Sequence, residues 1–300
     1  MVLAFKGTKI APVKNGANRW INIGGIEFQP SEIAKFALIL MFAHFIALYG
    51  SKMKTFRFGF LPFMGILVVI AGLVFLESHV SATLIICLIA VLMMFIGGTK
   101  MRYFVAIGVI GGVALACVLL FSDKFAYAMD RIYGWLDPFN PPEGVDTWQT
   151  VQSLYAIGSG GIFGKGLGNS AQKLGTIPEA QNDMIFSIIC EELGIFGAAL
   201  VLLLFGYMLY RLFFIAQNAC DLYGSMIAIG IMAHIALQVV LNICVASNLI
   251  PTTGITLPFI SYGGTSVLFL MMEMALALSV SRRIEFSGDD RKEEEQKRLS

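Results

Sequence analysis

The chain has 300 residues, of which 57% are hydrophobic and only 14% are charged, and its formal net charge is +1. Soluble domains carry about a quarter charged residues, so this composition, with a mean hydropathy of +0.77, excludes an ordinary soluble protein. The balanced charge gives no sign of a nucleic-acid partner. The five cysteines lie in or beside apolar runs without paired spacing, and we interpret them as core residues rather than disulfides or metal ligands.

Apolar runs of about twenty residues, the length that a helix needs to cross a bilayer, recur along the chain. They predict membrane-spanning helices at 31–50, 58–76, 81–98, 103–122, 183–215, 223–248 and 264–281. A segment at 147–161 has helical spacing of apolar residues but is too short to cross, so we expect a re-entrant or interfacial helix there. The predicted fold class is therefore all-α, a polytopic transmembrane helical bundle.

Basic residues in short loops predict the orientation of this bundle. They occur at 52–57, at 100–102, at Arg211 and at 282–283, and alternation of the spans puts all of them on one side, the cytoplasm. A large extracellular loop over about 123–182 then faces outward, together with the segment before Ser31. We expect an integral membrane domain over 1–284 and a charged, disordered cytoplasmic tail over 285–300.

Some basic residues lie where this orientation does not expect them. Arg19 precedes Trp20 in the first outward segment, and Lys165 and Lys173 lie in the large outward loop. One interpretation is ordinary surface charge on a loop. The other is an anion, such as a lipid phosphate, bound at the outer membrane face, because a guanidinium can hold a phosphate with two hydrogen bonds.

Three carboxylates stand within ten positions in "DMIFSIICEE", where the predicted span 183–215 begins. Asp183 is interpreted either as a helix N-cap or solvated residue, or as a general base where a membrane-bound substrate meets water. Glu191 and Glu192 would lie about 12–14 Å down a straight helix. An unpaired charge in hydrocarbon costs about 2.5–3.5 kcal/mol or more. We expect both in a structural polar network, with a direct part in catalysis or proton movement as the alternative.

Other polar residues give weaker signals. Glu32 lies in the first turn of the span at 31–50, and Lys35 three residues later can pair with it. His234 lies within a span and is interpreted as a packed histidine. The stretch "GSGGIFGKGLGNS" lacks the serine or threonine that a nucleotide phosphate loop needs after its lysine, but its glycines let the backbone approach another segment closely. We predict no metal site, because no pair of His, Asp or Glu has reliable ligand spacing.

Four stretches carry a resemblance to a known family. "NGANRWINIGGIEFQPSEIAKF", "QSLYAIGSGGIFGKGLGNSAQKL", "IPEAQNDMIFSIICEELG" and "PTTGITLPFISYGGTS" resemble the signature motifs of the SEDS proteins, the shape, elongation, division and sporulation family that includes FtsW, RodA and SpoVE. The resemblance implies an all-helical protein of ten spans in the bacterial cytoplasmic membrane. It also implies a peptidoglycan glycosyltransferase that polymerises lipid II into glycan strands at the outer face, beside a class B penicillin-binding protein and among membrane lipids.

The same resemblance implies roles for individual residues. Asp183 matches the family's essential aspartate and would take the proton from the acceptor sugar's hydroxyl, with undecaprenyl diphosphate as the leaving group. Arg19 and Lys165 would offset the developing charge of that group. The residues implied to bind substrate are Arg19, Lys165, Glu32, Lys35 and Gln172. The diphosphate is compatible with a divalent cation, Mg²⁺ or Mn²⁺, although no ligand set identifies one.

Three features depart from the family's pattern. Gln181 and Asn182 stand where the family usually has His-Thr before the aspartate, so no histidine is expected in this site. The stretch "ESHVSAT" lacks the family's Pro-Asp. Only "MVLAF" remains of the two spans that precede "NGANRW" in the family, so the first two membrane spans are expected to be missing.

Two other classes of function fit a polytopic protein with intramembrane carboxylates. One is a flippase or transporter of a lipid-linked precursor, which predicts polar residues through the full membrane depth. The other is a non-catalytic scaffold for a penicillin-binding protein. The gathering of cations and the candidate base at the outer face favours chemistry there.

Overall fold

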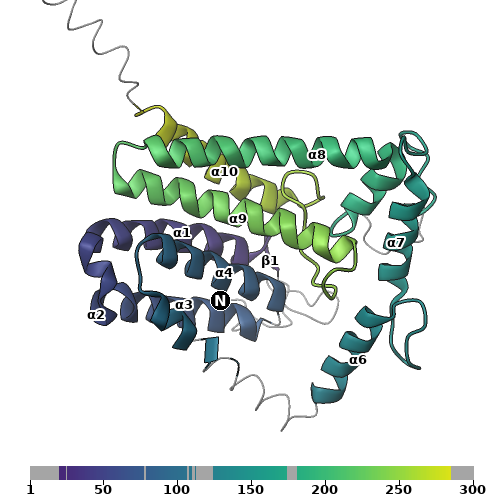
Figure 1. Ribbon diagram of the computed structural model, residues 1–300, viewed down its shortest axis with the longest axis horizontal. Helices are drawn as coiled ribbons and strands as arrows, with labels where there is room; N and C mark the ends of the chain where they lie inside the picture. Colours follow the sequence, from purple (N-terminus) through teal and green to yellow (C-terminus); the bar gives the residue numbers. More distant parts are fainter. Residues whose placement is uncertain are drawn as a thin grey trace, which may run out of the picture.

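In the computed structural model of the chain, the described residues are 20–24, 26–77, 79–106, 108–109, 112, 124–173 and 181–284. Figure 1 shows long helices lying side by side, with α6 and α7 at one end of the bundle and α2 at the other. The elements in chain order are β1 (Ile21–Ile23), β2 (Ile26–Phe28), α1 (Pro30–Tyr49), the 3₁₀ helix η1 (Gly50–Lys54), α2 (Phe56–Gly59), α3 (Leu61–Leu76), α4 (Val80–Ile96), α6 (Lys124–Leu136), α7 (Trp148–Gly160), α8 (Ile185–Asn218), α9 (Leu222–Ala246) and α10 (Gly264–Ser281).

The helices confirm an all-α membrane bundle. Five stretches are long and apolar enough to cross a membrane, namely Pro30–Lys54, Phe56–Leu76, Ile185–Asn218, Leu222–Ala246 and Gly264–Ser281, and each corresponds to a predicted span. The span predicted at 81–98 forms α4, a shorter apolar helix. The span predicted at 103–122 and the tail at 285–300 lie mostly or wholly outside the described residues. The strands β1 and β2 were not predicted, and they form a small antiparallel hairpin before α1.

Helix α9 lies at the centre of the bundle and packs against α1, α4, α8 and α10. Glycine permits the close contact with α1. A Cβ atom at Gly230 would lie 2.6 Å from the Cγ2 atom of Ile39 and 3.0 Å from the sulfur of Met93. Small residues at helix contacts let backbones come together in membranes, where van der Waals packing replaces the hydrophobic effect.

Helix α8 is broken at Gly194, whose φ of 65° and ψ of −163° are not helical. The first part, 185–193, therefore runs in a different direction from the long second part, 195–218, which lies along α9 (Figure 1). Because Glu191 and Glu192 precede the break, they do not lie down one straight membrane helix. The expected depth of about 12–14 Å assumed a rise of 1.5 Å per residue along a continuous helix, and it is wrong.

The segment predicted at 147–161 forms α7, a helix of 13 residues. Figure 1 shows α7 running across the direction of the long helices at their end. It packs mainly against α8. This position is that of a helix along the membrane surface and not of a span, as its length predicts.

Candidate functional site at the start of helix α8

Asp183 lies where α7, α8, α9 and the loop before α10 meet. The side-chain amide of Gln149, in α7, donates a hydrogen bond of 3.2 Å to Oδ1 of Asp183. The amide of Asn242, in α9, donates to the main-chain oxygens of Asp183 and Ile255, both at 2.7 Å. On the other side, a Cβ atom at Gly254 would lie 3.8 Å from Oδ2. Three elements thus fix the position and direction of this carboxylate.

The N-cap interpretation of Asp183 is wrong. The N-cap of α8 is Met184, and no side chain caps the helix. Asp183 is half-buried, one position further from the helix. The hydrogen bond from the uncharged Gln149 orients the carboxylate without neutralising it, which is what a general base requires.

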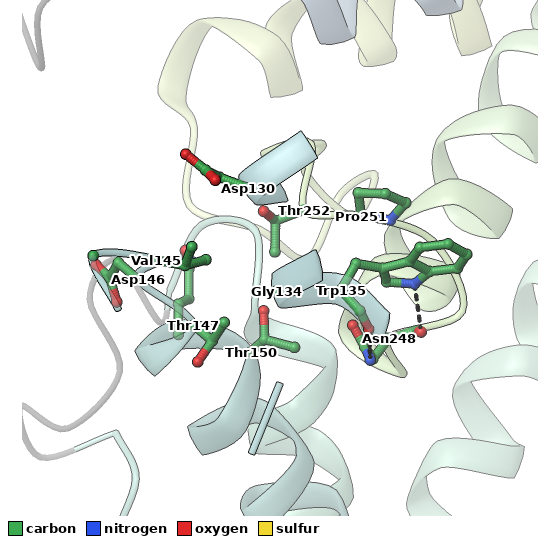
Figure 2. A pocket seen from close by; sticks show the side chains of 12 residues that line it. Asp130, Gly134, Trp135, Val145, Asp146, Thr147, Thr150, Asn248, Pro251 and Thr252 are labelled. Carbon is green, nitrogen blue, oxygen red and sulfur yellow. Dashed lines mark hydrogen bonds between the residues drawn. The ribbon is translucent and has the colours of Figure 1, made fainter. Parts of the chain in front are cut away.

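A cavity of about 390 Å³ adjoins this carboxylate. Its lining residues come from α6, the start of α7, the segment before it and the loop after α9, as Figure 2 shows for most of them. Gln149 belongs both to this lining and to the contacts of Asp183. The cavity is closed on one side by Trp135 and Asn248. The indole N–H of Trp135 donates to the main-chain oxygen of Asn248, and the Asn248 amide donates back to that of Trp135, both at 3.0 Å (Figure 2).

The expected pairing of the two inner glutamates is confirmed. Glu191 is fully buried, and its Oε1 lies 2.6 Å from Nζ of Lys165. It also accepts hydrogen bonds from the Ser170 hydroxyl at 2.5 Å and from the main-chain N–H of Gln172 at 3.4 Å. Glu192 pairs with Nζ of Lys173, again at 2.6 Å. Glu191 and Glu192 therefore tie the outward loop to the end of the first part of α8.

The glycine-rich stretch makes this attachment possible, as predicted from its glycines. A Cβ atom at Gly160 would lie 1.9 Å from the main-chain oxygen of Cys190, and one at Gly164 would lie 2.2 Å from that of Glu192. The two backbones are joined directly, because the main-chain N–H of Lys165 donates to Glu191 and that of Gly166 donates to Glu192, both at 2.9 Å. Gly194 meets the same loop from the α8 side, since its Cβ would lie 2.4 Å from Ile162 O. Only glycine fits at such contacts.

The predicted pair of Glu32 and Lys35 is also present. Nζ of Lys35 lies 2.8 Å from Oε1 of Glu32, and both side chains are buried within the bundle. A second buried pair joins α9 to α10, where Nδ1 of His234 lies 2.9 Å from both carboxylate oxygens of Glu273. His234 is thus packed, as predicted, but it is also ion-paired when protonated. In this conformation Glu32 and Lys35 reach a substrate only through the packing of α1.

The stretch "ESHVSAT" lies close to the loop that carries Gly254. The Ser81 hydroxyl donates a hydrogen bond to the main-chain oxygen of Thr253. His79 lies 3.3 Å from the side-chain amide of Gln29, just before α1. Partial burial raises the pKa of the Glu77 carboxyl above its ordinary value. Through Ser81, this stretch supports the loop opposite Asp183.

Two expectations have no structural counterpart to compare. Arg19 lies outside the described residues. A search of the described residues finds no group of three or more His, Cys, Asp or Glu that could hold a metal ion. The described part of the site therefore does not fit a bound divalent cation, and we assign no step to one.

Sequence reasoning found Asp183, Lys165, Glu191 and Glu192 but missed three residues that shape the site. They are Gln149, Trp135 and Asn248. Gln149 stands in the first turn of an amphipathic helix, where a polar residue is unremarked. Its partner is 34 positions away, and Trp135 and Asn248 are 113 positions apart.

Fold and site together define a multi-pass helical membrane protein with a positioned carboxylate at the end of its bundle. A model of the cell cycle protein family of FtsW, RodA and SpoVE matches residues 1–285. The chain belongs to this family.

Relatives and solved structures agree with this assignment. The chain is 41% identical to stage V sporulation protein E of Bacillus subtilis over 91% of this chain and 74% of that protein. It is 38% identical to a probable peptidoglycan glycosyltransferase FtsW of Trichlorobacter lovleyi, over 89% and 69%.

Among solved structures, it resembles a chain of a peptidoglycan synthase complex that coordinates polymerization and crosslinking, with a TM-score of 0.72, 27% identity, and coverage of 94% of this chain and 79% of that one. The rod shape determining protein RodA of Thermus thermophilus gives a TM-score of 0.62, 26% identity, and coverage of 93% and 74%.

Proposed function

We propose that this chain is a peptidoglycan glycosyltransferase that polymerises lipid II into glycan strands, with Asp183 as the general base. The observation that carries the proposal is the carboxylate of Asp183, held by Gln149 at the edge of an open cavity. Relatives named as peptidoglycan glycosyltransferases support the reaction.

The proposed step needs one proton transfer. Asp183 takes the proton from the acceptor sugar's hydroxyl while that oxygen attacks the anomeric carbon of the other substrate. The bond from this carbon to undecaprenyl diphosphate breaks, and the diphosphate leaves with the electron pair. A positioned general base contributes about 10²–10⁴-fold to such a rate.

Lys165 is the described cation best suited to offset the charge of the leaving diphosphate. Its ammonium is 2.6 Å from Glu191, yet its side chain is 37% exposed. An ammonium has three donors, so one bond to Glu191 leaves others for a phosphate oxygen. Roles for Arg19, Glu32, Lys35 and Gln172 in binding substrate stay predictions from the family resemblance.

The proposed site faces outward from the bacterial cytoplasmic membrane. Basic residues support this orientation, because Lys52, Lys54 and Arg57 lie in η1 and α2, at the opposite end of the bundle from α7 (Figure 1). Lipid II and the growing strand would then meet Asp183 at the outer face. The likeness to a synthase complex supports a class B penicillin-binding protein as the partner.

Transport of a lipid-linked precursor is the second candidate, and the buried pairs favour it. Glu32–Lys35 and His234–Glu273 are ionisable groups inside the bundle, where such residues often belong to a substrate or proton path. A scaffold that only positions its partner is the third.

The deciding experiment is lipid II polymerisation by the chain copurified with its penicillin-binding protein, whose transpeptidase site is blocked. Glycan strands from the unmutated protein, and none from an Asp183→Asn protein that still binds its partner, support the proposal. Strands that persist in Asp183→Asn overturn the role of the base. Movement of fluorescent lipid II across vesicles without any strand formation would favour transport.

A further inference from the structure

The cavity beside Asp183 has a distinctive charge. Asp130 and Asp146 are its charged residues, and among its described lining residues there is no basic side chain. The remaining lining residues are Gly134, Trp135, Gly144, Val145, Thr147, Gln149, Thr150, Asn248, Pro251 and Thr252. Two carboxylates repel a diphosphate, so the phosphate end of a lipid-linked substrate does not belong here.

The basic side chains lie elsewhere in the site. Lys165 and Lys173 pair with Glu191 and Glu192, at the far end of the first part of α8 from Asp183. A substrate with an anionic end and an uncharged end would therefore be sorted by charge, with its phosphates toward the lysines and its uncharged end in the cavity.

The lining suits the hydroxyl and amide groups of a sugar. Thr147, Thr150 and Thr252 can donate and accept hydrogen bonds, as can Gln149, while Asp130 and Asp146 accept them. A volume of about 390 Å³ lies within the range of small-molecule sites. Gln149 is the link to the chemistry, since the same side chain lines the cavity and holds Asp183.

We infer that this cavity is the subsite for the acceptor sugar, an uncharged N-acetylhexosamine whose hydroxyl Asp183 deprotonates. The inference rests on the proposed glycosyltransferase function and names the place of one of its substrates. Gln149 then orients the carboxylate from the wall of the subsite, and the diphosphate and lipid of the acceptor stay outside it.

The test is direct binding of a sugar that has no phosphate and no lipid. The probe is a β-1,4-linked disaccharide of N-acetylglucosamine, added to the protein–partner complex in detergent and followed by saturation-transfer NMR. Thr252→Phe fills the cavity, and Glu143→Phe is the matched control, because Glu143 is exposed beside the cavity but does not line it. We expect at least tenfold weaker binding in Thr252→Phe and unchanged binding in Glu143→Phe.

A second variant covers a failure of Thr252→Phe to fold, which thermal melting would reveal. Thr150→Val keeps the size of the side chain and removes its hydroxyl, and it should weaken disaccharide binding severalfold. Equal binding in the filled and control variants overturns the inference. Inorganic pyrophosphate that binds and is displaced by Thr252→Phe also overturns it, because the cavity would then be an anion site.

The outcome for the subsite is separate from that for the base. The disaccharide should bind Asp183→Asn as it binds the unmutated protein. If it does, and Asp183→Asn still polymerises lipid II, the subsite stands and the proposed base fails. If Asp183→Asn is inactive and no version binds the disaccharide, the base stands and the subsite fails.

Discussion

The two ends of the first part of α8 carry the same chemical group in different surroundings. Asp183, before the helix, is half-buried, accepts from the uncharged amide of Gln149 and stands beside a cavity. Glu191, near the break, has no exposed surface and accepts from an ammonium, a hydroxyl and main-chain N–H groups. A carboxylate with so many donors stabilises structure, whereas one oriented at an open edge is able to take a proton. The partners decide the role, and the residue type does not.

The largest expected effect is on activity at the exposed end. Asp183→Asn keeps the size of the side chain and removes the base, so polymerisation of lipid II should fall about 10²–10⁴-fold. The thermal unfolding of the protein in detergent should hardly change, since an amide oxygen can still accept from Gln149. A large loss of stability in this variant would mean that Asp183 is structural, like Glu191.

The next effect is on stability at the buried end. Glu191→Gln removes a charge that pairs with Lys165 and accepts several hydrogen bonds. Breaking a fully buried ion pair costs about 3–5 kcal/mol, but Lys165 is 37% exposed and can be solvated. We therefore expect a loss on the order of 2 kcal/mol.

Denaturation of the detergent-solubilised protein, followed by tryptophan fluorescence, measures this loss. Lys165→Met is the partner variant for a double-mutant cycle. If both single changes together cost as much as their sum, the two groups are not coupled and the network is wrong.

These two ends also show what the sequence could and could not predict. Length and hydropathy were enough for five spans and for α7, and a carboxylate at the mouth of an apolar run was enough to select Asp183. The break at Gly194 was not predicted, because the apolar run 185–218 continues through it and one glycine in a helix is tolerated. Its cause is the backbone of residues 162–164, which only the fold brings within 2.4 Å. For the same reason Gln149 was missed, since its role comes from a contact across helices.

Gln149 offers a smaller change at the exposed end. Gln149→Leu removes the donor to Oδ1 of Asp183, and we expect kcat to fall about tenfold, the equivalent of about 1.4 kcal/mol in barrier height. KM for lipid II should change less if Gln149 mainly positions the base.

The pH profile separates this role from a merely structural one. In Gln149→Glu a second carboxylate faces Asp183, and like charges raise the pKa of the pair. Since the base works only when ionised, activity on the acid side should be lost at higher pH than in the unmutated protein. An unshifted acid limb, with a uniform drop in rate, would contradict the positioning role.

The smallest expected effect lies beside Glu191, at its neighbour. Lys173→Met breaks the pair with Glu192, in which the lysine side chain is 36% exposed and the glutamate side chain 12% exposed. Pairs that water reaches contribute about 0–1 kcal/mol, so denaturation should show less than half the loss of Glu191→Gln. Glu192 also keeps a main-chain donor in Ser170, at 3.4 Å. If Lys173→Met cost as much as Glu191→Gln, the depth of burial would not be what distinguishes these carboxylates, and the whole corner would act as one cooperative unit.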